Sequence, residues 1–373
     1  MKSLRILHIE TGKTWRGSQR EVLYTLVGQR KRGHDSRLVC PPGVPLAARA
    51  KTAGIPIYEI PMVGEIDPRT VYRINQLLKS FHPEVVHLQS SHAHVLGGIA
   101  TRLTKVPAVI LNRWLDFPID KNIFSKIKYQ YFYDMIITVT EAVKQILVEG
   151  GVNPEKITAV YPAIEASEYQ IPETKNRLRH ELGLAPYIPV VGLLAYLEYR
   201  KGAQTLLGAA PKILKVLPET KFLIVGEGPY KDHLIKMTAE LGLTQSVIFP
   251  GFKKDVARVL AMLDVLTVPS YLEAGAVCLI EGMATGIPLV SSTAGGNPEL
   301  VQDRVNGLLV PPKDADKLAK AILTLLTDKP LAQQLVATGN KIVREKFNID
   351  TMVDAILNVY RGVLVKKNYP DVD

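Results

Sequence analysis

Short apolar segments alternate with amphipathic ones along this sequence, and the alternation limits the fold more than any other feature. Apolar segments of strand length stand at Ile6–Ile9, Ser36–Val39, Val85–Leu88 and Ala108–Leu111, and a helical pattern over Arg20–Arg32 separates the first two. Nearly continuous apolar strands separated by helices are typical of a parallel sheet that is covered on both faces. The first half of the chain is therefore predicted to be a doubly wound α/β domain.

The chain of 373 residues is long enough for two domains of ordinary size, each with its own core. A second doubly wound pattern begins at Val190, after a proline-containing connection over Pro162–Pro189. We therefore predict a first domain over residues 1–170 and a second over residues 171–348. A last helix at about Ile349–Val365 opens the C-terminal segment of residues 349–373.

The composition is that of a soluble globular protein, with 47% hydrophobic and 22% charged residues. No apolar run approaches the roughly 18 residues that span a bilayer, and Leu4–Ile9 is too short for a signal peptide. Cys40 and Cys278 match no zinc or redox spacing. These features predict a cytoplasmic protein.

The net charge of +10 is concentrated in the first half of the chain. Residues 1–170 contain 22 Lys and Arg against 15 Asp and Glu, whereas residues 171–373 contain 24 against 21. An anionic membrane surface, an acidic substrate or nucleic acid could use this charge, and solvated surface lysines explain it equally well. Because the chain contains no nucleic-acid recognition motif, we predict no nucleic-acid partner.

A strand, a small-residue turn and a helix follow one another in the stretch Pro269–Pro312. The turn is Glu273-Ala274-Gly275, and the helix is expected from about Ala276 to Thr285, where Gly286-Ile287-Pro288 stops it. The start of such a helix has backbone N–H groups without partners at the positive end of the helix dipole. This stretch is therefore predicted to bind an anion such as phosphate.

Two carboxylates, Glu273 and Glu281, flank this anion site. Glu281 is expected about 9 Å beyond the helix start, about the distance from a sugar ring across a diphosphate to a ribose. Carboxylate oxygens accept hydrogen bonds from neighbouring hydroxyls, so the pattern predicts a nucleotide-diphosphate sugar as ligand. Taken singly, each carboxylate could equally be a solvated surface charge.

The pattern E-x7-E, followed by G-M-A-T-G-I-P-L-V and A-G-G-N-P-E-L-V, resembles the signature of the retaining glycosyltransferases of family 4. This family has the GT-B fold, in which two doubly wound (Rossmann-like) domains face each other across a cleft. The similarity spans nearly the whole chain. One departure is Ala276, where the family usually has glycine; phosphate binding there requires that Ala276 adopt ordinary helical dihedral angles.

The resemblance implies that residues 171–348 bind the donor, a nucleotide-diphosphate sugar, and that no metal or cofactor takes part. Glu273 would bind the hydroxyls of the transferred sugar, Glu281 the ribose, and Lys201 the phosphates, so Glu273 and Lys201 are the candidate catalytic residues. Tyr196 replaces the arginine that the family usually has, and Arg200 could supply the missing charge. The candidate donor-binding residues are Gly17, Arg200, Lys201, Gly226, Gly251, Phe252, Gly275, Ala276, Val277 and Glu281.

Residues 1–170 would bind the acceptor, and the helix in 349–373 would cross back to this domain. A loop after the first strand and a segment after Leu111 should lie at the carboxyl ends of their strands, where ligands bind in doubly wound sheets. Two structural alternatives stay open: Trp15 could anchor its loop, and Arg113 could pair with Asp116. The acceptor-side candidates are Trp15, Arg16, Arg20, His92, Arg113 and Asp116.

The segment Lys121–Tyr133 interleaves lysines with aromatic residues. Such a segment suits a helix at an anionic membrane surface, although packing of the aromatics in the core is the more frequent arrangement. A peripheral position at the inner face of the membrane is therefore an alternative to a purely cytoplasmic one.

The resemblance implies a retaining transferase of a hexose-type sugar, metal-independent, that acts on a glycan or lipid-linked saccharide in lipopolysaccharide or cell-surface polysaccharide biosynthesis. Two other classes stay open. A GT-B nucleotide-sugar epimerase or phosphorylase would share the architecture, and a non-catalytic protein could bind sugar or nucleotide.

Overall fold

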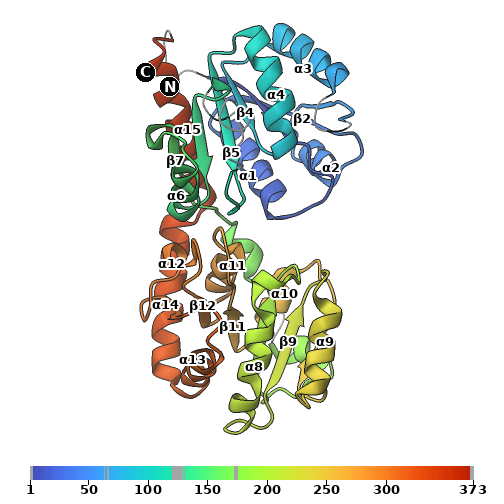
Figure 1. The fold of residues 1–373 in the computed structure, drawn as a ribbon, viewed down its shortest axis with the longest axis vertical. Coiled ribbons are helices and arrows are strands. Elements are labelled where there is room, and N and C mark those ends of the chain that lie inside the picture. The colour runs from blue at the N-terminus through green and yellow to red at the C-terminus, as the bar shows by residue number, and fades with distance from the viewer. Residues whose placement is uncertain are drawn as a thin grey trace. The chain divides into compact units, whose positions relative to one another are not determined.

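The computed structural model describes residues 3–62, 64, 67–119, 129, 131–171 and 175–369. Packing divides the chain into two compact units (Figure 1). Unit 1 comprises Met1–Ala163 and Ile349–Asp373, and unit 2 comprises Ile164–Asn348. Each unit has a parallel sheet with helices on both faces, which confirms the two doubly wound domains predicted from the alternating pattern.

Unit 1 contains, in its described part, a seven-stranded sheet of order β3-β2-β1-β4-β5-β6-β7, and all the pairings are parallel. The strands are β1 (Arg5–Ile9), β2 (Asp35–Cys40), β3 (Ile57–Glu59), β4 (Val85–Leu88), β5 (Ala108–Arg113), β6 (Met135–Thr138) and β7 (Ile157–Ala159). The helices are α1 (Gly17–Lys31), α2 (Pro45–Thr52), α3 (Pro68–Phe81), α4 (Ser91–Thr104), α6 (Glu141–Glu149), the short 3₁₀ helix η1 (Pro154–Lys156) and α15 (Ile349–Lys366). The strand order reverses between β1 and β4, and ligands bind at the carboxyl ends of strands at such a point.

Buried apolar side chains on the two faces of the sheet hold the helices of unit 1 in place. Leu7 and Ile9 of β1 pack in the cluster formed with α3, α4 and α6, whereas Ile6 packs in the cluster formed with α15. Helix α1 approaches α15 closely at Gly28, where an added Cβ would lie 2.6 Å from Val353. Successive side chains of a strand point to opposite faces of the sheet, and helices cover both faces. Nearly every strand residue must therefore be apolar.

Helix α1 begins at Gly17, three residues before the start that the apolar pattern predicts at Arg20. The side chain of Gln19 accepts a hydrogen bond from the backbone N–H of Arg16 at 3.1 Å. This contact satisfies the backbone N–H of the N-cap residue, and the helix extends over the polar residues before the apolar pattern.

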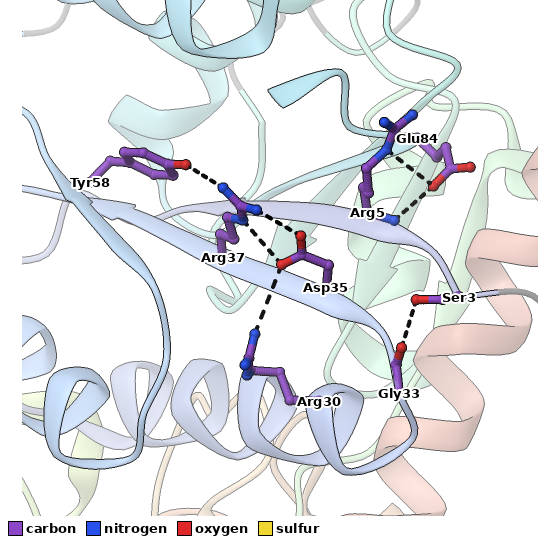
Figure 2. A network of polar contacts seen from close by, with 8 residues as sticks. All are labelled: Ser3, Arg5, Arg30, Gly33, Asp35, Arg37, Tyr58 and Glu84. Atoms are coloured by element: carbon purple, nitrogen blue, oxygen red, sulfur yellow. Dashed lines mark hydrogen bonds and ion pairs between the residues drawn. The ribbon is translucent and has the colours of Figure 1, made fainter. Parts of the chain in front are cut away.

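A set of ion pairs and hydrogen bonds closes the amino-terminal edge of the unit 1 sheet (Figure 2). The guanidinium of Arg37 donates to Asp35 at 2.8 Å and to the hydroxyl of Tyr58 at 2.6 Å, and Arg30 lies 3.8 Å from Asp35. Arg37 accordingly lowers the pKa of the Asp35 carboxyl. Several cations of the basic first half are therefore balanced by acids at this edge.

A chain of buried hydrogen bonds joins α15 to the carboxyl end of the sheet. Gln89 donates to Nδ1 of His8 at 2.9 Å, and Nε2 of His8 lies 2.9 Å from Oε1 of Gln29. Gln29 donates to the hydroxyl of Tyr360 at 3.3 Å, and that hydroxyl lies 2.6 Å from Nδ1 of His87. Since the amide of Gln89 can only donate to Nδ1, His8 carries its proton on Nε2 and is neutral.

Unit 2 contains, in its described part, a six-stranded parallel sheet of order β10-β9-β8-β11-β12-β13. The strands are β8 (Val190–Leu194), β9 (Lys221–Val225), β10 (Val247–Ile248), β11 (Val265–Val268), β12 (Leu289–Ser292) and β13 (Leu308–Val310). The helices are α7 (Lys175–His180), α8 (Ala203–Leu214), α9 (Lys231–Glu240), α10 (Val256–Ala261), α11 (Val277–Thr285), α12 (Asn297–Leu300), α13 (Ala315–Thr327), α14 (Lys329–Lys346), and the 3₁₀ helices η2 (Ala166–Tyr169) and η3 (Tyr199–Lys201). Helix α11 lies directly on the sheet, because Gly282 leaves room for Leu266.

The neutral buried histidines predict that unit 1 loses stability in acid. Burial lowers the pKa of His8 to about 4 and that of His87 well below its usual range. In the unfolded chain the histidines bind protons below about pH 6.5, whereas in the folded chain His8 binds its proton only near pH 4. The free energy of unfolding therefore falls as the pH is lowered through this window. His8 alone accounts for about 3 kcal/mol of this loss, at about 1.4 kcal/mol per pH unit.

Urea unfolding followed by tryptophan fluorescence measures this effect, because both tryptophans, Trp15 and Trp114, belong to unit 1. We expect His8→Gln to flatten the decline between pH 6.5 and pH 4, and a change at the exposed His180 of unit 2, His180→Gln, to leave it unaltered. An equally steep decline in the His8 variant would contradict the assignment.

Candidate active site

The predicted pair of Lys201 and Glu273 is brought together in unit 2. Lys201 ends η3 after β8, Glu273 lies in the loop after β11, and the Lys201 ammonium contacts Oε2 of the carboxylate at 2.7 Å. Ser270 donates to the same oxygen at 3.0 Å. Glu273 is only 7% exposed, so this is a charge-assisted contact in a largely desolvated environment.

A glycine allows the two loops to approach so closely. Gly202 follows Lys201 with φ +72°, and a Cβ at this position would lie 1.9 Å from the carbonyl oxygen of Pro269. Only glycine adopts this conformation at such a distance from another backbone. The position of Lys201 beside Glu273 therefore depends on Gly202 as well as on the lysine side chain.

The loop that carries Glu273 is supported by the Gly295-Gly296 turn. Gly296 donates its N–H to the carbonyl oxygen of Glu273 at 3.0 Å, and a Cβ on Gly295 would lie 1.9 Å from that oxygen. Gly275, with φ +134°, also needs the freedom of glycine. These contacts fix the backbone on both sides of the carboxylate.

The start of α11 differs from the prediction at Ala276. Its backbone is extended, with φ −74° and ψ 109°, rather than helical, and its N–H donates to Oδ1 of Asn297 at 3.2 Å. The helix begins at Val277, and the first turn of a helix provides N–H groups without intrahelical acceptors. Val277 and Cys278 are therefore better placed than Ala276 to offer N–H groups to an anion.

Glu281 of α11 is buried and oriented by a residue that the motif did not mark. The hydroxyl of Tyr169 on η2 donates to Oε1 of Glu281 at 2.7 Å, and the glutamate is 6% exposed. Burial, with Glu281 and Glu273 nearby, raises the pKa of the Cys278 thiol, so this cysteine stays protonated. Tyr169 and Glu281 are 112 positions apart in the sequence, which explains why no local pattern could reveal the contact.

Arg200 has a carboxylate partner of its own. Its Nε donates to Glu198 at 2.9 Å, and its carbonyl oxygen accepts the N–H of Tyr271 at 2.7 Å. Tyr196, at the position where the family usually has arginine, is exposed. Arg200 therefore contributes to the shape of the η3 loop, besides any contact with a ligand.

The glycine turns after β9 and β10 adjoin one another. Gly226 donates its N–H to the carbonyl oxygen of Gly251 at 3.1 Å, and its φ of +140° and closeness to Ala195 exclude a side chain. Phe252 follows with 66% of its surface exposed, so it does not pack in the core. The aromatic ring is available to a flat ligand.

The acceptor-side candidates of unit 1 lie on different parts of its carboxyl edge. Trp15 is partly buried against the cluster between α1 and α2, with the Arg49 guanidinium 4.2 Å above its ring, so it does anchor its loop. Arg16 precedes α1 as its N-cap, Gly17 is the first residue of the helix, and Arg20 lies one turn later. His92 is exposed in the first turn of α4.

Arg113, at the end of β5, shapes the loop that follows. Its guanidinium donates to the carbonyl oxygens of Leu115 at 3.1 Å and Phe117 at 2.5 Å, while Asp116 is buried. The indole N–H of Trp114 donates to the carbonyl oxygen of Gln89 at 2.7 Å. The Trp114 side chain thus links the ends of β4 and β5, whereas Arg113 holds only the loop after β5.

A cavity of about 160 Å³ lies at the carboxyl ends of β1, β4 and β5, within unit 1. Arg113 lines it, and so do polar residues that were not among the candidates, including Glu10, Gln89 and Asn112. Glu10 and Gln89 directly follow a strand and Asn112 is the next-to-last residue of β5, and this position was the sequence signal that could have identified them.

Much of the basic aromatic segment lies outside the described residues, which omit 120–128 and 130. Of its described aromatics, Tyr129 and Tyr133 are buried and Tyr131 is exposed. The Tyr133 hydroxyl donates to the carbonyl oxygen of His94 at 2.8 Å, as expected for a core residue. Among the helices described, none has both the length and the apolar character needed to cross a bilayer.

Comparison with known families decides the classification. A family model described as Glycosyltransferase Family 4 matches residues 15–168, and one described as Glycosyl transferases group 1 matches residues 174–342. The chain belongs to the group 1 glycosyltransferases of the family 4 type. The resemblance seen in the motifs is thus confirmed over both halves of the chain.

Relatives of this glycosyltransferase come from bacteria and archaea. An Escherichia coli UDP-Gal:α-D-GlcNAc-diphosphoundecaprenol α-1,3-galactosyltransferase is 26% identical, with 98% of each chain covered. An uncharacterised glycosyltransferase of Methanocaldococcus jannaschii is 27% identical, over 74% of this chain and 75% of the relative.

Solved structures establish the GT-B fold. Anabaena HepE in complex with UDP superimposes with a TM-score of 0.83 at 22% identity, covering 96% of this chain and 100% of that chain. A glycosyltransferase from Rickettsia africae gives a TM-score of 0.86 at 19% identity, covering 98% and 99%. At these identities the likeness concerns the fold.

The contact between Tyr169 and Glu281 can be tested by removing one hydroxyl. Tyr169→Phe takes a hydrogen bond from a buried carboxylate, so we expect the free energy of unfolding to fall by about 1–3 kcal/mol. Urea unfolding followed by circular dichroism measures the loss, and hydrogen exchange in α11 should rise. The same change at the fully solvated Tyr187, which is 82% exposed, is the control and should have no effect. Equal stability of the two variants would contradict the role of Tyr169.

Proposed function

We propose that this glycosyltransferase transfers a hexose-type sugar, with retention of anomeric configuration, from a nucleotide-diphosphate sugar to a saccharide or lipid-linked saccharide. The observation that carries the proposal is the buried contact of Lys201 with Glu273 close to the start of α11, the helix that also holds Glu281. A cation, helix N–H groups and two carboxylates form a set that suits a diphosphate with hydroxyl groups on both sides.

Each of these residues has a distinct chemical task in the proposed reaction. The leaving nucleotide diphosphate gains negative charge as the bond to the sugar breaks, and Lys201 with the N–H groups of Val277 and Cys278 would stabilise it. Glu273 would accept hydrogen bonds from sugar hydroxyls, and Glu281, oriented by Tyr169, from the ribose. This set contains its own positive charge, so the proposed reaction needs no metal ion.

The known proteins similar to this chain support a nucleotide-sugar donor. HepE has been solved in complex with UDP and with UDP-glucose, and the name of the Escherichia coli relative specifies a UDP-sugar donor and a GlcNAc-diphosphate lipid acceptor. Two other structural neighbours are the lipopolysaccharide enzymes WaaB and WaaG. A role in lipopolysaccharide or other cell-surface polysaccharide synthesis is proposed on this basis.

Peripheral attachment to the inner face of the membrane is part of the proposal. The positive charge of the first 170 residues would attract anionic lipid, and Leu115, Phe117 and Tyr131 of unit 1 are exposed apolar side chains. A lipid-linked acceptor would be reached from that surface.

Thermal stabilisation by a panel of nucleoside diphosphates and nucleotide sugars tests the donor assignment. A ligand at 100 times its Kd raises the free energy of unfolding by about 2.7 kcal/mol. We expect nucleotides of one base to stabilise the wild type against heat. Glu281→Ala should abolish this stabilisation, and the control Glu240→Gln, at an exposed site, should retain it. If no nucleotide in the panel stabilised the wild type, the donor-site assignment would be contradicted.

Kinetics of transfer test the catalytic assignment. With the donor from that panel and a GlcNAc-diphosphate lipid, Lys201→Ala and Glu273→Gln should each lower kcat/KM at least about 100-fold. Lys201 would stabilise the charge that develops on the leaving diphosphate, and Glu273 would both hold Lys201 and orient the sugar. Lys236→Ala and Glu240→Gln break an exposed ion pair of α9 and should have no effect. An inverted anomer in the product, or an epimerised donor formed without acceptor, would refute the proposed reaction.

A further inference from the structure

A cavity of about 390 Å³ lies at the amino-terminal edge of the unit 1 sheet. Pro107 and Asp134, which line it, directly precede β5 and β6, so it adjoins the edge of the sheet opposite to the carboxyl ends. All its lining residues belong to unit 1. Its volume is within the range of about 300–1,000 Å³ that is typical of small-molecule pockets. This cavity is therefore distinct from the site around Lys201 and from the acceptor-side candidates.

Three cationic side chains from the ends of two helices line this cavity. Arg102 belongs to the last turn of α4, Lys105 directly follows that helix, and Lys367 directly follows α15. The one carboxylate among the described lining residues is Asp134, which lies 2.6 Å from the Lys367 ammonium and accepts the N–H of Val109 at 2.8 Å. Three cations and one carboxylate leave an excess of two positive charges in the lining.

The excess charge is on Arg102 and Lys105, which are both exposed. Within the part of the chain that the structure describes, neither side chain has a hydrogen-bond or ion-pair partner. Cations at the end of a helix often compensate its dipole. Here, however, the carbonyl oxygen of Thr101 already accepts the backbone N–H groups of Lys105 and, at 3.3 Å, of Val106. The backbone itself closes this end of α4, so the guanidinium and the ammonium keep their donors available.

Apolar side chains form another part of the lining. These are Val106, Pro107 and Phe132, together with the ring of Tyr369 near the end of the described chain, and each is only partly exposed. Phe132 packs against α4 at Gly98, where an added Cβ would lie 3.2 Å from the aromatic ring. The cavity thus combines cations with an apolar surface, which suits a ligand that has an anionic group and a ring or hydrocarbon part.

We propose that this cavity binds a phosphate monoester. Arg102, Lys105 and Lys367 donate to the phosphate, and the apolar side chains contact the ring or hydrocarbon part of the ester. A phosphate monoester carries a charge of about −1.5 to −2 at pH 7, which matches the positive excess, whereas a carboxylate leaves part of it unbalanced. The planar guanidinium can bind two phosphate oxygens at once. The Lys367 ammonium donates to the carbonyl oxygen of Pro107 at 2.8 Å and contacts Asp134, so one of its three donors remains.

Two sources offer this group: a soluble sugar phosphate, and the headgroup of a phospholipid such as phosphatidate. Saturation-transfer NMR with glucose 6-phosphate tests the first source, with glucose and glucuronate as comparisons. Co-sedimentation with phosphatidate vesicles tests the second, with phosphatidylglycerol vesicles of equal net charge, whose phosphate is a diester, as the comparison. Preference for the monoester in either experiment supports the proposal and identifies the source, and preference in neither overturns it.

A double variant locates the binding. Arg102→Ala combined with Lys105→Ala should weaken binding of the monoester at least about tenfold, because two charged donors are lost. Both side chains are exposed, so the fold should be retained. Arg73→Ala combined with Lys79→Ala removes the same charge from exposed positions of α3 in the same unit and should leave binding unaltered. Equal weakening by the two double variants would reveal attraction by overall charge alone and would overturn the proposal.

Lys201→Ala separates this cavity from the candidate active site, which also offers groups for phosphate. We expect monoester binding to persist in Lys201→Ala, and nucleotide binding to persist in the Arg102 and Lys105 double variant. Loss of monoester binding in Lys201→Ala would place the phosphate in unit 2 and would overturn the inference. The inference does not rest on the proposed transfer reaction: if no nucleotide bound, the donor site would fail while the monoester site would stand.

Discussion

Both sheets of this protein are parallel and covered on both faces, and this constraint decides where its chemistry can occur. Strand residues such as Leu7, Val86 and Leu266 are completely buried, so a polar side chain is tolerated there only with partners around it. His8 and His87 meet this condition through the network that ends at Tyr360. Other polar residues collect where the strands end, and the candidate sites of both units are found there.

The site of unit 2 depends on backbone crowding as much as on its charged side chains. Gly202, Gly226 and Gly295 each lie so close to a carbonyl oxygen that an added Cβ would come within 2 Å of it. These approaches hold the loops after β8, β9, β11 and β12 in one arrangement, in which Lys201 and Glu273 meet. A side chain at any of the three glycines would separate these loops before it affected the charged pair itself.

The sequence was sufficient for the features that repeat or that are local. The alternating pattern predicted both parallel sheets, and the strand and helix starts around Glu273 follow from small residues and proline nearby. The meeting of Lys201 and Glu273, 72 residues apart, was accessible only because the motif places both in one site. Their catalytic and binding roles remain predictions.

The sequence patterns did not predict contacts between residues that are distant in the chain. Ala276 donates its N–H to Asn297, so the residue that replaces the usual glycine is extended and stands outside the helix. Tyr169 reaches Glu281 from a short helix near the unit boundary, and the burial of the Glu10 carboxyl is evident only in the folded chain. Each of these depends on tertiary packing between distant segments, which local patterns do not encode.

The buried pair of Lys201 and Glu273 is hard to explain by stability alone. A buried ion pair such as Lys201–Glu273 contributes little to stability, because the desolvation of both charges offsets their attraction. Its presence beside helix N–H groups is better explained by a ligand that brings negative charge to the cation and hydroxyls to the carboxylate.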